Sequence, residues 1–451
     1  MIKKFILLSL VASQLMVSCS NDDSPTTDPT KELTLEEQIA NLVKQPYSKL
    51  TPTEQKAKLE IEANDMLVQL DKSKSSSAIE AIENLSRLLG VSSIDIFDGK
   101  NDNEVEDILN VSGVYGVYTW DNAWKKWVKT ASTTELKFVF PAKESQTANN
   151  AIFSSKSTSS DIKVKYNDSY IYGGNGTVEV NDYFFLPNTA DATLTIDNKE
   201  AAVFTQTAKY ANGKEVPTEF SYKMSLNDGY VWEMSGTKAS ANTSKATLTY
   251  NGKNLISFNA GSSAEIDKLI DNDELVQYRG KANGLFQLMD NFVIVADMDL
   301  ATEAADKEAL YKNNTRPAYL DYKDPKSDYK AYYTALNAYE KKISEGNAAN
   351  FNKNMKLILV SKKDGTKIAD IVQHSEKDGE YTFNLPIWDA EFKYWDNWNS
   401  TGESFTRPYL YEAYYLKFND NTEVEMSAYF SSGFEKLQTK FDDFIAAFNK
   451  Q

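Results

Sequence analysis

A long stretch of this chain alternates apolar and polar residues with a period of two, the repeat of a β-strand. Leu136–Phe140 reads LKFVF and stops at Pro141. Four glycine-containing turn signals punctuate the stretch, at residues 173–176, 212–213, 228–229 and 251–252. Asn-Gly and Asp-Gly pairs suit two-residue hairpin loops, because both central residues adopt positive φ. The sequence therefore predicts an antiparallel meander of about eight to ten strands between residues 113 and 260.

The segment before this meander has helical spacing instead. Thr34 with Glu37 predicts a capping box, and Thr51-Pro52 predicts a second helix start with proline at its first position. A third helix is expected over residues 78–89, with Gly90 as a left-handed cap. We expect these three helices to pack beneath the sheet.

Helices and strands alternate in the remainder of the chain. A short helix is expected at 264–270, two strands within 285–300, helices at 302–311 and 328–345, hairpins at 355–373 and 409–430, and an amphipathic helix at 434–448. The expected fold class is α+β, a mainly antiparallel meander or curved sheet with N-terminal helices and a C-terminal amphipathic helix.

The expected organisation is a signal peptide (1–18), a tether (19–32), a helical segment (33–112), an antiparallel β region (113–260) and an α+β region (261–451). Residues 248–269 and 416–437 share the order strand, turn, strand, helix. Either they form an internal repeat of two related halves, or they share a common local motif by chance.

The first residues have the composition of a secretory signal. Lys3 and Lys4 precede an apolar run over 5–17, which is too short to span a bilayer, and the run leads into Cys19. The ending Met16-Val17-Ser18-Cys19 resembles the lipobox of bacterial lipoproteins, although Met16 replaces the usual leucine. That resemblance implies cleavage before Cys19 and a lipid anchor on it. The alternative is an ordinary buried thiol.

The residues after Cys19 carry a second resemblance. Ser20, Asn21, Asp22 and Asp23 resemble the acidic export tag of Bacteroidota surface lipoproteins. The resemblance implies an outer-membrane protein that faces the cell surface. The alternative is that these residues are a solvated linker.

Charge and composition exclude several function classes. Loss of residues 1–18 leaves 47 basic against 65 acidic residues, a net charge of −18, which disfavours nucleic-acid binding. Cys19 is the only cysteine, and the only histidine, His374, lies in a pattern typical of a half-exposed strand residue. Most zinc sites need several His or Cys ligands. We expect no catalytic residues, no metal and no cofactor.

Aromatic residues cluster with acids and amides between residues 386 and 415. The candidate ligand-binding residues are Trp388, Asp389, Tyr394, Trp395, Asp396 and Trp398. Exposed rings stack on the C–H face of a sugar while carboxylates and amides take its hydroxyls. The alternative is that the rings are core residues of a loop or lid.

Two other groups of residues favour structural explanations. Trp120, Trp124 and Trp127 are expected to pack in the core or across strands. The acidic stretches 98–104 and 297–299 do not fit a calcium-binding loop, and we expect them to be solvated.

These observations predict a non-catalytic, lipid-anchored envelope protein of a Bacteroidota-type bacterium that binds a glycan or another envelope ligand. Its expected partners are the membrane, through Cys19, and a carbohydrate. The alternative is a structural or adhesion component of the cell surface without a small-molecule ligand. Protein partners and oligomeric state stay open.

Overall fold

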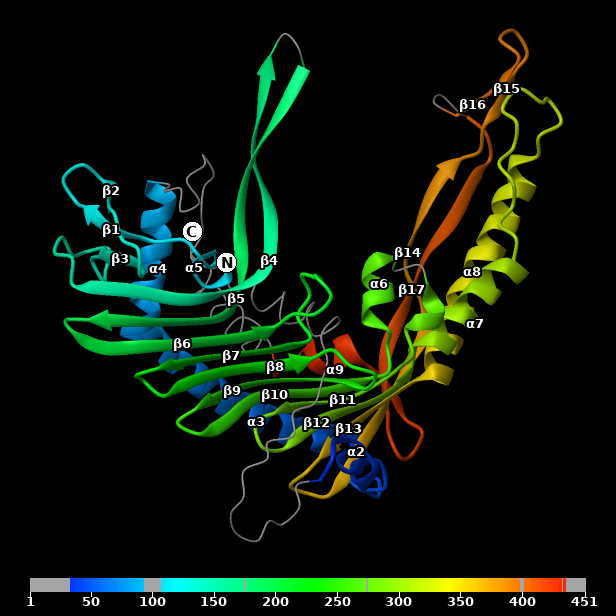
Figure 1. Cartoon of the computed structure of the whole chain (residues 1–451). Coiled ribbons are helices and arrows are strands. Elements are labelled where there is room, and N and C mark those ends of the chain that lie inside the picture. Colours follow the sequence, from blue (N-terminus) through cyan, green and yellow to red (C-terminus); the bar gives the residue numbers. More distant parts are fainter. Residues whose placement is uncertain are drawn as a thin grey trace.

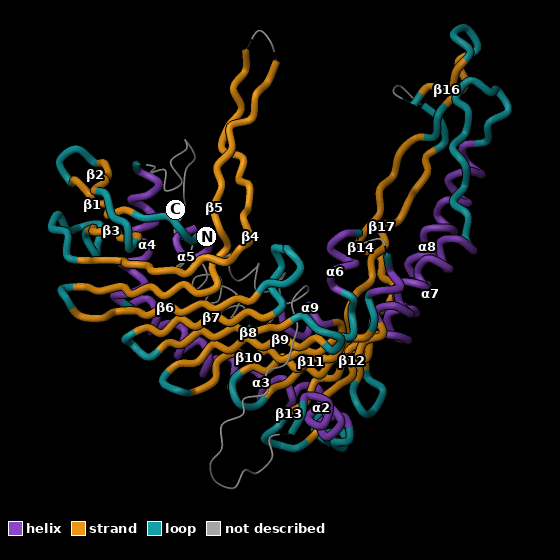
Figure 2. Tube along the Cα trace, viewed as in Figure 1, coloured by secondary structure: helices purple, strands orange, loops and turns teal. Residues whose placement is uncertain are grey.

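The computed structural model describes residues 33–92, 107–173, 176–272, 275–397, 401–431 and 433–434. Cys19, the acidic residues after it, Trp398 and residues 435–448 of the expected C-terminal helix lie outside the described residues. The described strands form one 16-stranded sheet and a separate two-stranded one (Figures 1 and 2). The expected α+β class with a curved, mainly antiparallel sheet is confirmed.

The first ten strands follow one another along the chain. They are β1 (Gly116–Asp121), β2 (Lys126–Thr130), β3 (Leu136–Phe140), β4 (Ala151–Gly173), β5 (Gly176–Ile196), β6 (Lys199–Lys209), β7 (Glu219–Leu226), β8 (Tyr230–Thr237), β9 (Asn242–Tyr250) and β10 (Lys253–Ser262). The number of strands agrees with the expectation. The topology departs from a pure meander at one point, because β1 pairs with β3 in parallel.

The sheet continues through the second half of the chain. The later strands are β11 (Lys281–Leu288), β12 (Phe292–Asp299), β13 (Met355–Ser361), β14 (Thr366–Asn384), β15 (Ile387–Asp389), β16 (Tyr394–Asp396), β17 (Ser404–Lys417) and β18 (Glu423–Glu425). The order across the sheet is β18-β17-β14-β13-β12-β11-β10 and then on to β4, β3, β1 and β2. β15 and β16 form the separate hairpin.

The helices lie at the start of the chain and between strands. They are α2 (Leu35–Val43), α3 (Pro52–Asp71), α4 (Ser77–Val91), α5 (Asp107–Asn110), α6 (Ile266–Asp271), α7 (Leu300–Asn313), α8 (Tyr329–Asn354) and α9 (Met426–Ser431), with 3-10 turns at Lys72–Ser75 and Val276–Tyr278. The capping box expected at Thr34 is present. The helix start expected at Thr51 is also present, with Pro52 in its first turn, and Thr51 forms a second capping box with Glu54.

The expected end of the third helix is wrong. α4 runs through Gly90 to Val91, and Gly90 does not adopt the left-handed backbone of a helix cap. The extended residue Ser92 ends the helix instead. Glycine permits a left-handed cap but does not require one, because it also fits a helical backbone at a modest entropic cost.

The Asn-Gly turn signals of the sequence predicted one tight turn correctly and another wrongly, and one tight turn has no such signal. Asn251 and Gly252 both have positive φ and form the two-residue turn between β9 and β10. Asn212 and Gly213 also have positive φ but lie in a longer loop, so the expected tight turn there is wrong. The turn between β5 and β6 uses Asp197-Asn198, without a glycine.

The second strand of the last hairpin, expected over 422–430, is present as β18 but is much shorter than expected. β18 ends at Glu425 and α9 follows at once. The Glu425 carboxylate accepts hydrogen bonds from the backbone N–H groups of Ser427 and Ala428, at 3.0 Å each. This contact satisfies the first donors of a helix and therefore starts one.

Helices cover both faces of the sheet. Leu59 of α3 packs with Phe292 and Leu359, whereas Ile39 of α2 packs with Val293 and Val360. Successive strand residues point to opposite faces, so α2 and α3 lie on opposite sides of β12 and β13. The largest core joins α3 and α4 to strands β1 to β10.

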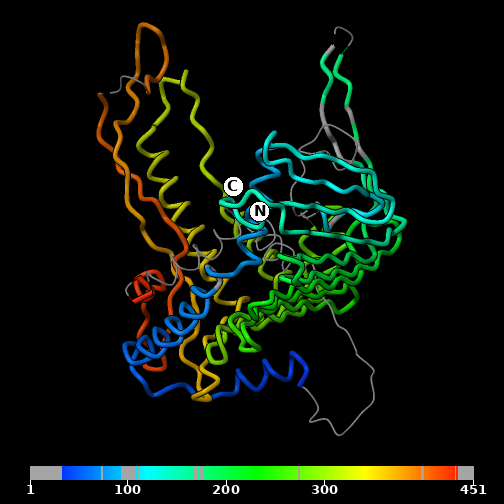
Figure 3. Tube along the Cα trace, turned by 90° about the vertical axis from the view of Figure 1, so that its left-hand side faces the viewer, coloured from blue at the N-terminus to red at the C-terminus, as the bar shows by residue number. Residues whose placement is uncertain are grey.

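Two hairpins extend beyond the sheet as arms. The first arm is the outer part of β4 and β5, residues 157–188. The second arm is the outer part of β14 and β17, residues 373–414, with α8 alongside and the β15–β16 hairpin at its end. Both arms point the same way in both views, and α2 lies at the opposite end of the molecule (Figures 1 and 3).

Candidate functional site

An ion pair joins the second arm to α8. Arg407 on β17 donates both bonds of its Nη2 to the Glu340 carboxylate, at 2.6 and 2.5 Å. It also donates from Nη1 to the Tyr381 hydroxyl at 2.8 Å and from Nε to Asn337 at 3.2 Å. The guanidinium lies 5.6 Å from the Tyr333 ring centre. This cluster holds α8 against the strands.

A row of packed rings continues from this ion pair towards the end of the arm. Tyr333 of α8 packs against Phe383 and Phe405 at centroid distances of 4.9 and 5.9 Å. Tyr329, one turn earlier, lies 5.2 Å from Trp395. Burial raises the pKa of both the Tyr329 and Tyr333 hydroxyls. The row connects the helix to the hairpin at the end of the arm.

The predicted tryptophans form part of this scaffold. Trp388 and Trp395 face each other across β15 and β16, with ring centroids 5.9 Å apart. The Trp395 indole N–H donates to the Asp324 carbonyl at 2.8 Å, and its backbone N–H donates to the Tyr322 carbonyl at 2.8 Å. Both tryptophans are half-buried. Trp395 therefore fixes the loop between α7 and α8 onto the hairpin.

The acidic candidates and Tyr394 lie on the same hairpin. Oδ1 of Asp389 accepts the backbone N–H groups of Glu391 and Phe392, at 2.9 Å each, and so shapes the turn. Tyr394 and Asp396 are half-buried on β16. Five of the six candidates are thus brought together, and Trp398 lies outside the described residues. The stretch from 386 to 415 contains β15, β16 and most of β17.

The most exposed rings at the end of the arm were not predicted from the sequence. Tyr319 is 78% exposed, Phe392 70% and Tyr322 52%. Tyr319 and Tyr322 belong to the 314–328 loop, and Phe392 lies in the β15–β16 turn. We call these three residues the aromatic tip. A signal for the two tyrosines was available, since they lie between Pro317 and Pro325 in a polar loop that joins two helices.

His374 lies within hydrogen-bond distance of a carboxylate at the base of the second arm. Its Nε2 lies 2.5 Å from Oε2 of Glu423, and its ring packs edge-to-face on Tyr415 at 4.9 Å. Burial raises the pKa of the Glu423 carboxyl, but hydrogen bonds from Lys417 and His374 outweigh burial and hold this pKa below its usual range. The half-exposed strand position expected for His374 is confirmed. The contact links β18 to β14 across β17.

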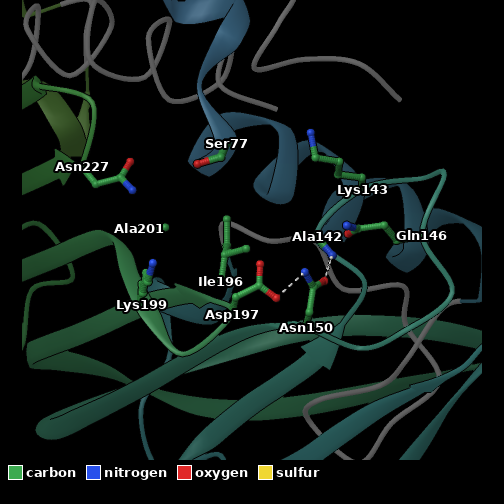
Figure 4. A pocket seen from close by; sticks show the side chains of 10 residues that line it. All are labelled: Ser77, Ala142, Lys143, Gln146, Asn150, Ile196, Asp197, Lys199, Ala201 and Asn227. Atoms are coloured by element: carbon green, nitrogen blue, oxygen red, sulfur yellow. Dashed lines mark hydrogen bonds between the residues drawn. The ribbon is translucent and has the colours of Figure 1, made fainter.

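A cavity of about 270 Å³ opens beside the start of α4 (Figure 4). Asn150 Oδ1 accepts the backbone N–H of Ala142 at 2.9 Å, and its Nδ2 donates to Asp197 at 3.1 Å. Lys143 pairs with Glu80 at 2.6 Å. Asp197 is the single carboxylate among the described lining residues, whereas glycoside hydrolysis ordinarily uses a pair. The side chains of Asn150 and Lys143 make their polar contacts with neighbouring segments of the chain and hold these segments together.

The remaining sequence candidates have structural roles. Trp120 and Trp127 pack across β1 and β2 at 5.2 Å, as expected. The expectation for Trp124 is wrong: it lies in the turn between these strands, where it has no strand position to pack from, and it is 76% exposed. Asp299 caps α7 by accepting the Thr302 N–H at 3.0 Å. Residues 98–104 lie outside the described residues.

The described part of the chain lacks two features typical of metal-binding and membrane-spanning proteins. No three His, Cys, Asp or Glu side chains there are grouped to hold a metal ion. None of its helices combines the length and apolar composition that crossing a bilayer requires.

No protein-family model, curated protein or solved structure matches this chain. A curved sheet by itself does not imply a function. The geometry and chemistry of the aromatic tip are therefore the basis for a functional proposal.

Proposed function

We propose that this chain is a non-catalytic, lipid-anchored protein of the outer membrane of a Bacteroidota-type bacterium, and that its second arm binds a glycan. The aromatic tip is the binding surface. The alternative is a structural or adhesion component of the cell surface, in which the tip contacts no small-molecule ligand.

The observation that carries the proposal is the exposure of Tyr319, Tyr322 and Phe392 on a rigid support. Rings such as Tyr333 and Phe383 pack against one another, whereas these three are exposed at the end of the arm. Tyr409, which is 55% exposed, lies on β17 outside the loop and the turn that carry these three. Exposed apolar rings at the end of such an arm are candidates for an interaction surface. Two of the three are tyrosines, which combine an apolar face with a hydroxyl and suit contact with sugars.

The support beneath the tip lowers the entropic cost of binding. The two hydrogen bonds of Trp395 fix the backbone at Tyr322 and Asp324. Asp389 fixes the backbone at Phe392 in the same way. Groups held before the ligand arrives lose less conformational freedom on binding.

The expected position of the membrane anchor is compatible with the direction in which the arms point. Residues 19–32 would form the tether, and 14 residues reach at most about 50 Å when fully extended. The tether leads into α2, which lies at the end of the molecule away from both arms. An anchor at Cys19 would therefore leave the aromatic tip free to meet ligands away from the membrane.

Glycan retention tests the proposal directly. The mature chain is run through affinity gels that contain amylopectin, xyloglucan, galactomannan or yeast mannan. We expect one of these neutral polysaccharides to retard the chain, and Tyr319→Ser with Phe392→Ser to weaken retention about tenfold or more, as loss of stacked rings does elsewhere. Both residues are exposed, so the melting temperature should change little.

Trp124→Ser is the matched control, because Trp124 is an equally exposed ring in a turn of the β1–β2 hairpin. It should bind as the unmodified chain does. Absence of retention on all four gels, or equal retention of the tip variant and the control, would contradict the proposal and favour the structural alternative.

A further inference from the structure

The first arm departs from the sheet as a two-stranded ribbon. β4 pairs with β3 only over residues 151–155, and β5 pairs with β6 only over residues 189–196. Beyond these points β4 and β5 pair with each other as far as Gly173 and Gly176. A two-stranded ribbon is marginally stable in water, so an arm of this length is an unusual feature to retain without a use.

The outer end of this ribbon exposes large side chains. Tyr172 is 80% exposed, Tyr170 49% and Val178 62%. Tyr170 and Tyr172 lie two residues apart on β4 and therefore on one face, with their ring centroids 6.4 Å apart. These two rings form a second exposed aromatic surface, which we call the ribbon platform.

The ribbon is poorly suited to adding a partner strand along its edge. The β4–β5 pairing is irregular at three places, between residues 158 and 159, 159 and 163, and 167 and 169. Bulges of this kind twist an edge away from further pairing, and Lys163 and Lys165 add charge to it. A ligand would therefore contact this surface through the faces of its rings and not by pairing with its backbone.

The charge near the ribbon platform favours a neutral ligand. Lys165 and Glu179 neutralise each other through an ion pair of 2.7 Å. Residues 170–172 and 177–178 carry no charge, and the whole chain has a net charge of −16. A polyanion is repelled by the chain as a whole and finds no basic group among these residues.

The two arms are far apart along the sheet. Nine strand-to-strand steps separate β5 from β14, and at about 4.8 Å per step this is roughly 40 Å along the curved sheet. Figure 1 shows the two arms well apart in space. A mono- or disaccharide is much shorter than this separation. A single ligand that touches both arms must be a polymer.

We infer that the ribbon platform, Tyr170 and Tyr172, is a second stacking site for the same glycan chain, and that the ligand is a long, uncharged polysaccharide held by both arms. This inference rests on the proposed function of the second arm. Two linked contacts raise the overall affinity above that of either contact, because binding at the second becomes intramolecular.

Ligand length provides the test. The probes are the four neutral polysaccharides named above and a short oligosaccharide fragment of whichever one is bound. In Tyr170→Ser with Tyr172→Ser, we expect affinity for the polymer to fall about tenfold or more. Affinity for the short fragment should stay unchanged, since the aromatic tip alone holds it. Trp124→Ser is again the control, and thermal melting reports on the fold of each variant.

The outcomes separate this inference from the proposed function. Polymer binding that depends on Tyr319 and Phe392 but not on Tyr170 and Tyr172 overturns the inference and leaves the proposed function intact. No binding by the unmodified chain overturns both. If sedimentation with neutral phospholipid vesicles depends on Tyr170 and Tyr172 while polymer binding does not, the ribbon is a membrane contact and the inference is wrong.

Discussion

Arg407 and Glu340 meet through two charge-assisted hydrogen bonds, at 2.6 and 2.5 Å, between β17 and α8. They lie 67 residues apart in the chain. The Arg407 side chain is only 13% exposed, so water competes weakly for it. The ion pair fixes α8, the helix that carries Tyr329 and Tyr333 of the row of packed rings. It thereby helps to fix the geometry of the second arm.

Glu340→Gln should destabilise this arm. The substitution keeps the shape of the side chain but removes its charge, and hydrogen bonds to charged groups contribute about 1.5–3 kcal/mol each. We expect a decrease of about 1–3 kcal/mol in the free energy of unfolding, measured by urea titration. Lys341→Gln is the control, since its exposed pair with Glu345 should contribute little. Equal stability of the two variants would argue against a role for the ion pair.

Trp395→Phe should loosen the 314–328 loop while keeping an aromatic ring in the hairpin. Loss of the indole hydrogen bond to Asp324 costs about 1 kcal/mol. The expected result is faster tryptic cleavage after Lys323 or Lys326, followed by mass spectrometry. Trp388→Phe keeps its ring contact with Trp395 and should leave cleavage of the loop slow. The prediction fails if the two variants are cut at the same rate.

Acid should weaken the contact between α3 and the turn that joins β13 to β14. A hydrogen bond from Lys58 and one from Ser361 hold the pKa of Asp364 below its usual range, although burial opposes them. A carboxylate with a lowered pKa in the folded chain stabilises it above the unfolded pKa of about 4, and this contribution is lost as the pH falls through the folded value.

Asp364→Asn removes that titration. We therefore expect the stability difference between the unmodified chain and this variant to be largest near neutral pH and to shrink below about pH 4, in urea titrations at several pH values. Asp161→Asn changes an exposed carboxylate and serves as the control. A difference that stays constant with pH would contradict this explanation.

The membrane anchor is tested by Cys19→Ala. Without the thiol no diacylglycerol can be attached, so the variant should incorporate no fatty-acid label in metabolic labelling. Asp22→Ala with Asp23→Ala should keep the label but lower the fraction of protein removed by protease from intact cells. Equal labelling with and without Cys19 would exclude the anchor, and unchanged shaving would mean that the two acids are only a linker.

Local chemistry predicted much of the fold from the sequence. Thr34 with Glu37, Thr51 with Pro52, and Asn251 with Gly252 each act within four residues, so their outcome depends little on the rest of the chain. The alternation of buried residues in β3 is equally local, because it follows from the pleat of a strand. These features determined the helices, most of the strands and the α+β class.

Distant contacts decided the candidate site. Whether Trp395 is a ligand-binding ring or a scaffold depended on a carbonyl 71 residues earlier, at Asp324. The position of the loop that carries Tyr319 and Tyr322 likewise depends on distant contacts, namely the docking of α8 on β14 and β17 and the hydrogen bonds of Trp395 to the loop. No local propensity encodes such a docking, since it depends on which surfaces meet once the sheet has formed. The sequence by itself thus determined the elements and the pool of aromatic residues, and only the tertiary structure decided which rings are packed and which face solvent.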